Sequence, residues 1–527
     1  MKKTIALVSA ILLLLTGCSS SETKTVEGNV TGQGAPITTE GESENVINLS
    51  MSVVRSLNPI FNTDETVNNV FSLMYEKLIN IGSDGKAEPN IAESWSFNDE
   101  GNVLTLNLRN DVCFSDGSSL TAYDVAYSLK TIDRAEASYY KNCSNNIKTW
   151  SVSSDYSMTV TFYNDGGNNI YYLSFPVISR TLYGGDYAVD SDSPNTALTN
   201  GLYRFDSLAE AKQLSLVASL NCFKGMAEVE KVMVTMTKDR STQINLFSQG
   251  ISDLLPADET ELAGQSTAVG VNKTNYVTNI YDFIGFNFNN NIFGDRNIRQ
   301  AIAYSVDQDS IIESVYLGNA EKAYSPISSS SWLYDKNVYG YDYDIQTAKM
   351  LLEQSGWRFR TSSSVRENTD GGKLSATILV NKENNERNQI AQIIADSLKV
   401  LGFEISIDSV DYETYKQRVE SGSFDILVGS WTLSPVNDFS FMFETGNNSI
   451  GYSSEKMDEY IKNCNTAVTD EQMTEAYGKF QKYVSQELPY ISLVFRQSSV
   501  YSSQRLQGDI IPARYNVFNG IKNVTVK

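Results

Sequence analysis

The chain has no histidine, which removes most kinds of catalytic site before any motif is considered. A Ser-His-Asp or Cys-His nucleophile, an imidazole general base and a His-Glu-x-x-His zinc site all need that residue. Paired carboxylates do not need it, so a surface glycoside hydrolase stays open as an alternative. With 63 acidic residues, however, pairs of carboxylates must occur somewhere and indicate little by themselves. The absence of histidine therefore narrows the possible catalytic sites to those that need no imidazole.

Four of the five cysteines offer no clear chemistry either. Cys113, Cys143, Cys222 and Cys464 are widely spaced, and none belongs to a Cys-x-x-Cys pair. Complete pairing would allow three disulfide arrangements, but the long spacings favour free or singly paired thiols. We expect no metal site and no cofactor.

The fifth cysteine, Cys18, follows a segment that is typical of a signal peptide. Lys2 and Lys3 precede an apolar run at 5–15, which would span only about 16 Å of a bilayer core of roughly 30 Å. The ending Leu15-Thr16-Gly17-Cys18 resembles a bacterial lipobox, in which the cysteine is lipidated and becomes the mature N-terminus. Two acyl chains on Cys18 would hold the protein stably at a membrane. We expect residues 1–17 to be a lipoprotein signal peptide.

Composition bounds the rest of the chain. Residues 18–44 contain few large apolar side chains, so we expect a flexible tether. The net charge of −21 disfavours nucleic acid as a partner, because a phosphate backbone attracts clustered Lys and Arg. The length of 527 residues suggests roughly three domains of about 150 residues each.

Alternating and helical patterns in the last third of the chain predict a β-α-β-α-β unit. Apolar residues alternate or cluster as strands at 374–380, 403–407 and 424–428, and helical stripes occur at 390–401 and 415–419. This order implies parallel strands. In proteins with such sheets, ligands bind at the loops that follow the carboxyl ends of the strands. The sequence therefore points to residues 381–386 and 429–438 as binding loops.

Shorter patterns predict further elements. Alternating apolar residues at 104–108 and 158–162 favour half-buried strands, with a helix beginning after Thr121 between them. Asp295 and Asp344 precede two more helical stripes, which they can cap.

Short motifs between residues 56 and 493 occur in the order found in the family 5 extracellular solute-binding proteins of ABC importers, which the chain resembles. They are Ser56-Leu57-Asn58-Pro59, Tyr75-Glu76-Lys77-Leu78, Pro89-Asn90-Ile91-Ala92-Glu93-Ser94-Trp95, Leu106-Asn107-Leu108-Arg109, Phe114-Ser115-Asp116-Gly117, Leu120-Thr121-Ala122-Tyr123-Asp124-Val125, Arg299-Gln300-Ala301, Asp307, the 348–357 segment, Gly422-Ser423-Phe424-Asp425 and Leu488-Pro489. Each motif is short, but the ordered set behind a lipobox is specific.

The resemblance implies an α/β, two-lobed periplasmic-binding-protein-like fold with an extra domain and a hinge between the lobes. Carried onto this chain, lobe I comprises 45–85, 201–281 and 489–527. The additional domain is 86–200, and lobe II is 282–488. Lobe II contains the β-α-β-α-β unit that the periodicity predicts.

The resemblance also implies site residues. Trp431, with Thr432 beside it, matches a pocket tryptophan of peptide receptors. Three positions on, those receptors carry an aspartate that pairs with the peptide's α-ammonium, whereas this chain has Ser434. A hydroxyl replaces a carboxylate there, and Asp438 is the nearest substitute. Recognition of a free peptide N-terminus is therefore in question.

Five further positions follow from the same comparison. Asn62, Thr63 and Asp64 follow the Asn58-Pro59 turn, where the family lays a strand along its ligand. Tyr412 lies where a pocket aromatic is expected, and Lys382 lies at a strand end, where it could meet a ligand carboxylate.

The resulting hypothesis is a lipid-anchored receptor that captures peptide-like solutes and delivers them to an ABC permease. Such a receptor performs no bond chemistry, so we expect a protein that is not an enzyme. The permease and its ATPase must be other chains, since no Gly-x-x-x-x-Gly-Lys-Ser/Thr segment occurs here. We expect a monomer on the outer face of a bacterial cytoplasmic membrane, at a cell surface or in a periplasm. Oligosaccharide cargo is the nearest alternative, and nickel-chelate capture is disfavoured without histidine.

Overall fold

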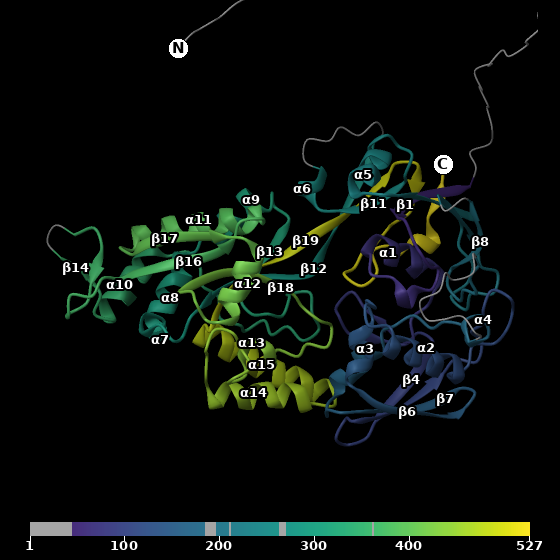
Figure 1. Ribbon diagram of the computed structural model, residues 1–527, viewed down its shortest axis with the longest axis horizontal. Coiled ribbons are helices and arrows are strands. Elements are labelled where there is room, and N and C mark those ends of the chain that lie inside the picture. The colour runs from purple at the N-terminus through teal and green to yellow at the C-terminus, as the bar shows by residue number, and fades with distance from the viewer. Residues whose placement is uncertain (1–44, 185–195, 210–211, 263–269, 361–362) are drawn as a thin grey trace, which may run out of the picture. The chain divides into compact units, whose positions relative to one another are not determined.

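The computed structural model describes residues 45–184, 196–209, 212–262, 270–360 and 363–527 (Figure 1). Residues 45–527 form one compact unit. The expected signal peptide, tether and lipidated Cys18 lie outside the described residues.

A first sheet of four strands has the order β1-β10-β9-β8. Its strands are β1 (Val46–Ser52), β10 (Lys231–Thr237), β9 (Gln213–Ala218) and β8 (Tyr203–Ala209). β1 runs parallel to β10, and the other pairs are antiparallel. Alternate residues of β1 are buried, and α1 (Glu65–Met74) and α5 (Arg240–Ser248) pack against this strand.

A second four-stranded sheet is antiparallel throughout, in the order β4-β5-β7-β6. Its strands are β4 (Ala92–Phe97), β5 (Val103–Leu108), β7 (Ser157–Phe162) and β6 (Ile147–Ser154). The helices between and after them are α2 (Ala122–Arg134), α3 (Lys141–Asn145), η2 (Gly167–Leu173) and α4 (Arg180–Tyr183). The predicted alternation in β5 and β7 is confirmed, and α2 begins after Thr121, whose N–H donates to the Asp124 carboxylate over 3.0 Å.

The third sheet has the order β11-β19-β12-β18-β16-β17, with β13 beside β19. Its strands are β11 (Leu254–Ala257), β19 (Tyr490–Ser503), β12 (Val271–Phe286), β18 (Ile426–Thr432), β16 (Ser375–Asn381), β17 (Glu404–Val410) and β13 (Ala320–Lys322). The long strands β12 and β19 connect the α5 and β11 region to the β16 and β18 region (Figure 1).

The predicted β-α-β-α-β unit is confirmed. β16 pairs in parallel with both β17 and β18, and α11 (Asn385–Val400) and α12 (Tyr412–Glu420) connect them. Alternation divides the core between the two faces of this sheet. Ile378 and Val380 pack on the α11 side, whereas Leu379 packs with residues of α15 (Asp470–Glu487).

The remaining elements are short connections and helices. The helices are η1 (Pro59–Phe61), α6 (Glu259–Leu262), α7 (Asn291–Gly294), α8 (Arg296–Ser305), α9 (Gln308–Val315), α10 (Ile345–Gln354), α13 (Ser440–Phe443), α14 (Glu455–Thr466) and η3 (Ile521–Asn523). The two-residue strands are β2 (Asn80–Ile81), β3 (Ala87–Glu88), β14 (Arg358–Phe359), β15 (Arg366–Glu367), β20 (Leu506–Gln507) and β21 (Thr525–Val526). Asp295 and Asp344 cap α8 and α10 as predicted.

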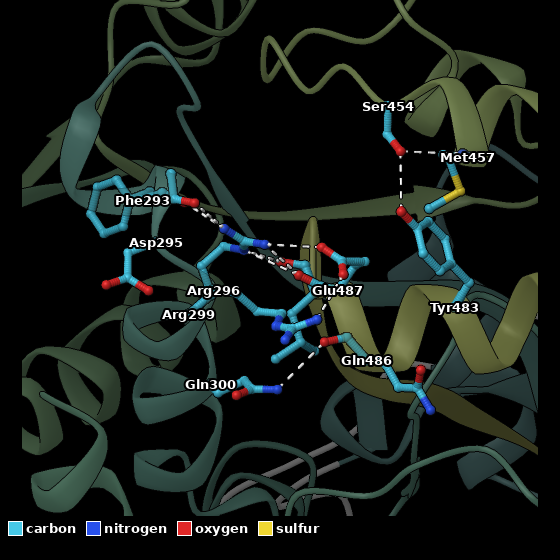
Figure 2. Close-up of polar contacts among 12 residues, drawn as sticks. Phe293, Asp295, Arg296, Arg299, Gln300, Ser454, Met457, Tyr483, Gln486 and Glu487 are labelled. Carbon is cyan, nitrogen blue, oxygen red and sulfur yellow. Dashed lines mark hydrogen bonds and ion pairs between the residues drawn. The ribbon is translucent and has the colours of Figure 1, made fainter. Parts of the chain in front are cut away.

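Arg299 of α8 holds the C-terminal end of α15 (Figure 2). Its side chain is 2% exposed and donates to the carbonyls of Glu487 over 2.6 Å and Leu488 over 3.1 Å. It also donates to the carbonyls of Phe293 over 2.8 Å and Gly294 over 3.1 Å. The last carbonyls of a helix lack partners within the helix. Two of the sequence motifs, those at Arg299 and Leu488, therefore meet in a structural contact.

Cys113, Cys143, Cys222 and Cys464 are free thiols. Among the described residues, no three Cys, Asp or Glu side chains are grouped so that they could hold a metal ion. None of the helices in the described part of the chain has the length and apolar content needed to cross a membrane.

Candidate functional site

A cavity of about 350 Å³ lies beside α1, and we name it the α1 cavity. Its wall combines segments that are distant in sequence. They are α1 with Tyr75, Lys77 and Ile81, the 139–143 and 171–176 segments, Asn279 with the 432–436 loop, and residues 514–517. Part of the second predicted binding loop, 429–438, therefore faces residues from the beginning, middle and end of the described chain.

One face of α1 supplies the polar side of this cavity. Glu65, Asn68, Asn69 and Ser72 line it, at a spacing that places them on one side of a helix. Val67, Val70, Leu73 and Met74 point into the core, and Phe71 is buried but also lines the cavity. The Asn68 side-chain N–H donor is buried without a hydrogen-bond partner. The helix is therefore amphipathic, and its polar face lines a cavity instead of open solvent.

Tyrosines form much of the remaining wall. The six that line the cavity are Tyr75, Tyr139, Tyr140, Tyr171, Tyr172 and Tyr515. Burial raises the pKa of Tyr171 and Tyr172 to about 12, so both phenols stay protonated at neutral pH. Each can present a ring face to an apolar group and a hydroxyl to a polar one.

Trp431 and Thr432 are consecutive residues of β18 that line different cavities. Thr432 lines the α1 cavity, whereas Trp431 lines a cavity of about 320 Å³ that we name the Trp431 cavity. Successive side chains of a strand point to opposite faces, which explains the separation. Tyr412 lines the Trp431 cavity too, so these two predicted aromatic residues lie together.

The Trp431 ring is held by other aromatic rings. It stacks on Phe283 with 3.8 Å between ring centroids and an interplanar angle of 15°, and Tyr490 meets it edge-on. Arg387 lines the same cavity and donates to the side chains of Ser430 and Asn381. This cavity is aromatic and carries a guanidinium.

Ser434 and Asp438 also separate. Ser434 lines the α1 cavity, and its hydroxyl accepts a hydrogen bond from the Val436 N–H over 3.2 Å. Asp438 instead lines an open groove of about 870 Å³, where it accepts from Ser440 and from the Asn465 side chain over 3.1 Å. The aspartate considered as a substitute for the family carboxylate thus lines a different depression.

The residues after the Asn58-Pro59 turn stabilise the start of α1. Asp64 is its N-cap and accepts from the N–H groups of Thr66 over 2.9 Å and Val67 over 3.2 Å. Burial alone would raise the pKa of Asp64, but these bonds and those from the hydroxyls of Thr66 and Ser52 lower it overall. Asn62 donates to the Asp64 carbonyl over 2.7 Å, and Thr63 is exposed. None of Asn62, Thr63 and Asp64 is among the residues that line the α1 cavity.

Lys382 is exposed at the end of β16, and it too is absent from the α1 cavity wall. Sequence reasoning missed most of that wall. The spacing of Glu65, Asn68, Asn69 and Ser72 within an apolar helix was a signal that could have found α1. No sequence pattern could have predicted that residues 139–143 and 514–517 lie together, because their proximity arises from long-range tertiary folding.

A family model describes this chain: the bacterial extracellular solute-binding proteins, family 5, match over residues 86–453. The chain belongs to this family. Family 5 proteins are transport receptors and not enzymes, so the prediction of a non-enzymatic receptor is confirmed.

Individual family 5 proteins resemble the chain over most of its length. The oligopeptide-binding protein AppA of Bacillus subtilis is 24% identical over 486 residues, 88% of each chain. A probable D,D-dipeptide-binding periplasmic protein of Escherichia coli is 23% identical, over 88% of this chain and 91% of its own.

Solved family 5 structures confirm the expected two-lobed fold. A nickel ABC transporter protein of Bacillus halodurans has a TM-score of 0.79 at 20% identity, covering 92% of this chain and 100% of its own. The AppA structure from Bacillus subtilis, in complex with a nonapeptide, has a TM-score of 0.61 at 20% identity, covering 92% and 99%.

Proposed function

We propose that the protein captures peptide-like solutes in the α1 cavity and delivers them to an ABC permease. The observation that carries this proposal is the cavity wall, in which tyrosines and asparagines from α1 and the 139–143 and 171–176 segments face the loop after β18. Family 5 relatives named for oligopeptides and dipeptides support a peptide cargo, although other relatives are named for nickel and heme.

The chemistry of the wall suits a peptide backbone. Each peptide unit offers one N–H donor and one carbonyl acceptor. Asparagine amides and tyrosine hydroxyls can both donate and accept, so one wall can serve different side-chain sequences. The wall contains five asparagines: Asn68, Asn69, Asn142, Asn279 and Asn516. The tyrosine rings add apolar surface for ligand side chains.

Capture is expected to couple to lobe closure. Under the domain boundaries we infer, 45–85, 201–281 and 489–527 form lobe I, 86–200 the additional domain and 282–488 lobe II. The α1 cavity then has α1 on lobe I and residues 432–436 on lobe II. A solute that contacts both stabilises the closed arrangement, because it gains contacts there that the open one lacks. The closed arrangement would be the form that the permease recognises.

The proposal includes a location. Cys18 would carry the lipid, residues 18–44 would be the tether, and the receptor would act as a monomer outside the cytoplasmic membrane. The transmembrane and ATPase subunits would be separate chains.

Native mass spectrometry of the mature protein, followed by thermal-shift screening, tests the cargo. A ligand that binds only the folded state stabilises it by about 2.7 kcal/mol at a hundredfold excess over Kd. We expect stabilisation by peptides within the range of two to eight residues. Stabilisation by neutral oligosaccharides without any response to peptides would contradict the peptide assignment and favour a sugar receptor.

A further inference from the structure

Lys77 places a cation in the wall of the α1 cavity. It follows α1 by three residues, and its backbone is fixed by pairing with Pro176 and by the Asn90 side chain, which donates to the Lys77 carbonyl over 2.6 Å. The backbone from which the Lys77 side chain projects is therefore fixed by the fold.

The ammonium of Lys77 has no ion pair and no hydrogen bond with any described residue. The adjacent carboxylate, Glu76, is already engaged: it accepts from Lys224 over 2.6 Å and from Asn90 over 3.0 Å. Lys77 also borders a neighbouring cavity that contains this Glu76–Lys224 pair. On the α1 cavity side, its titratable neighbour is the Cys143 thiol, which is neutral because burial raises its pKa to about 12.

Lys77 is half-buried, so its ammonium stays open to the cavity while the surrounding wall partly removes it from water. Lysines are almost always exposed or paired, because removing a charge from water is costly. Burial accordingly lowers the pKa of Lys77, and the nearby Cys143 and Glu76 only partly oppose this. Nothing in the packing of the described residues compensates for it. Because the Lys77 ammonium lowers stability and has no structural partner in the part of the chain that the structure describes, we expect its partner to be a group of the bound solute.

Arg514 supports this interpretation. It lines the α1 cavity, is half-buried and packs over the Tyr515 ring, and no ion pair to it is formed within the described residues. The acidic residue on the cavity wall is Glu65, which is exposed at the rim. In a chain of net charge −21, the cavity thus carries more positive than negative groups.

We propose that Lys77 binds a carboxylate of the solute, so that the receptor selects peptide-like solutes that carry a negative charge at this end of the cavity. This assignment rests on the proposed function for the cargo class. The carboxylate can be the C-terminus of a peptide or an acidic side chain, and Arg514 adds a second positive charge to the same wall.

Calorimetric titration with matched peptides tests the assignment. The probes are tetraalanine with free termini, its C-terminal amide, and amidated tetrapeptides with aspartate at each position in turn. A charged hydrogen bond changes affinity by about tenfold or more, so the wild type should bind the free acid at least that much more tightly than the amide. Recovery of affinity by an amidated aspartate peptide would identify a side-chain carboxylate as the partner.

Variants then tie the preference to Lys77. Lys77→Met should bind acid and amide alike, and Lys77→Arg should keep the preference. Lys130→Met is the matched control, because Lys130 is exposed on α2 and its loss removes the same charge. Retention of the preference in Lys77→Met would overturn the assignment, as would a wild type that binds all these peptides without regard to charge.

A separate set of probes distinguishes failure of the peptide proposal from failure of the role assigned to Lys77. If no peptide binds the wild type, neutral and uronic-acid oligosaccharides are compared. Binding of the uronic acids that Lys77→Met abolishes would reject peptide cargo and retain the role of Lys77. Absence of binding by any of these probes would overturn both proposals.

Discussion

The Arg299 side chain donates to the carbonyl of Leu488 over 3.1 Å, although 189 residues separate the two. The bond belongs to a set in which one buried guanidinium serves four carbonyls, at the end of α15 and around α7 (Figure 2). Leu488 itself has a left-handed φ of 52°, which ends the helix and turns the chain into β19. Arg299 thus stabilises the point where the chain returns toward the first sheet.

Replacement of Arg299 by lysine should destabilise the fold. The planar guanidinium reaches carbonyls in several directions, whereas a lysine ammonium is a point charge with three donors. Each carbonyl left buried without a donor costs about 1–3 kcal/mol, so a loss of several kcal/mol is expected. Urea denaturation measures it, with Arg296→Lys as the control, because Arg296 is exposed and contacts the Glu487 side chain instead. Equal losses in the two variants would contradict the assigned role.

Lys77→Met should stabilise the solute-free protein by about 0.5–2 kcal/mol, the usual gain when a functional cost is removed. Because the folded-state pKa of Lys77 is lowered, the unfolded chain binds this proton more tightly. Stability of the wild type therefore rises with pH between the folded and unfolded pKa values of this group. The advantage of Lys77→Met should be largest at neutral pH and shrink toward pH 10. Melting curves of both proteins over this range would show whether the gap narrows.

Ser434→Asp should increase the preference for a free peptide N-terminus. The residue lines the α1 cavity, so a carboxylate there can pair with the α-ammonium of a bound peptide. A charged partner typically adds about 1.5–3 kcal/mol over none. The measurement compares free and N-acetylated peptides by calorimetry in both proteins. Ser434→Asn, which adds bulk without charge, is the control, and an equal effect of both substitutions would refute the expectation.

Tyr477→Phe should weaken a buried contact between η2 and α15. The Tyr477 hydroxyl accepts from the Asn168 side chain over 2.7 Å and donates to the Asn437 carbonyl over 2.8 Å. Its loss leaves the buried Asn168 side chain and the partly buried Asn437 carbonyl without this partner, at a cost of about 1–3 kcal/mol for the buried group. Chemical denaturation of this variant, beside Tyr163→Phe at a 65% exposed tyrosine, tests the value of the contact. A Tyr477→Phe protein as stable as the wild type would argue against it.

Cys18→Ala should release the protein from the membrane when it is expressed in a bacterium that processes lipoproteins. Two acyl chains hold a protein stably, and without them no anchor remains in the proposed arrangement. Fractionation with immunoblotting would detect the shift from the membrane pellet to the soluble fraction. Membrane retention of a variant from which residues 1–17 have been cleaved would count against the lipid anchor.

Much of the fold could be predicted from periodicity alone. The strands at 374–380 and 424–428 are largely buried and the one at 403–407 is partly buried, each with an alternating or continuous apolar pattern that is local in sequence. The parallel order of β18, β16 and β17 follows from the helices between them. The order β11-β19-β12 could not be predicted this way, because β19 and β12 are about 200 residues apart and pair only through tertiary folding.

The candidate site was less predictable for a related reason. The loop after β18 was expected from the rule for parallel sheets, and Thr432 and Ser434 do line the α1 cavity. Because side chains alternate along a strand, Trp431 lines another cavity. Asp64 caps α1 instead of lining the α1 cavity. Lys77 was visible only as part of a motif, since its lack of a partner is a property of the packed molecule.

The pairing of Gly285 in β12 with Tyr490 in β19 has a consequence for how such proteins diversify. The segment between these two residues, 286–489, therefore begins and ends at adjacent positions in the sheet, and a change in its length would not move those positions. This segment can therefore be inherited or exchanged as a cassette while the rest of the chain keeps its fold. A lineage that encounters new nutrients can alter the loop after β18 within that cassette and leave α1 and its capping residues untouched.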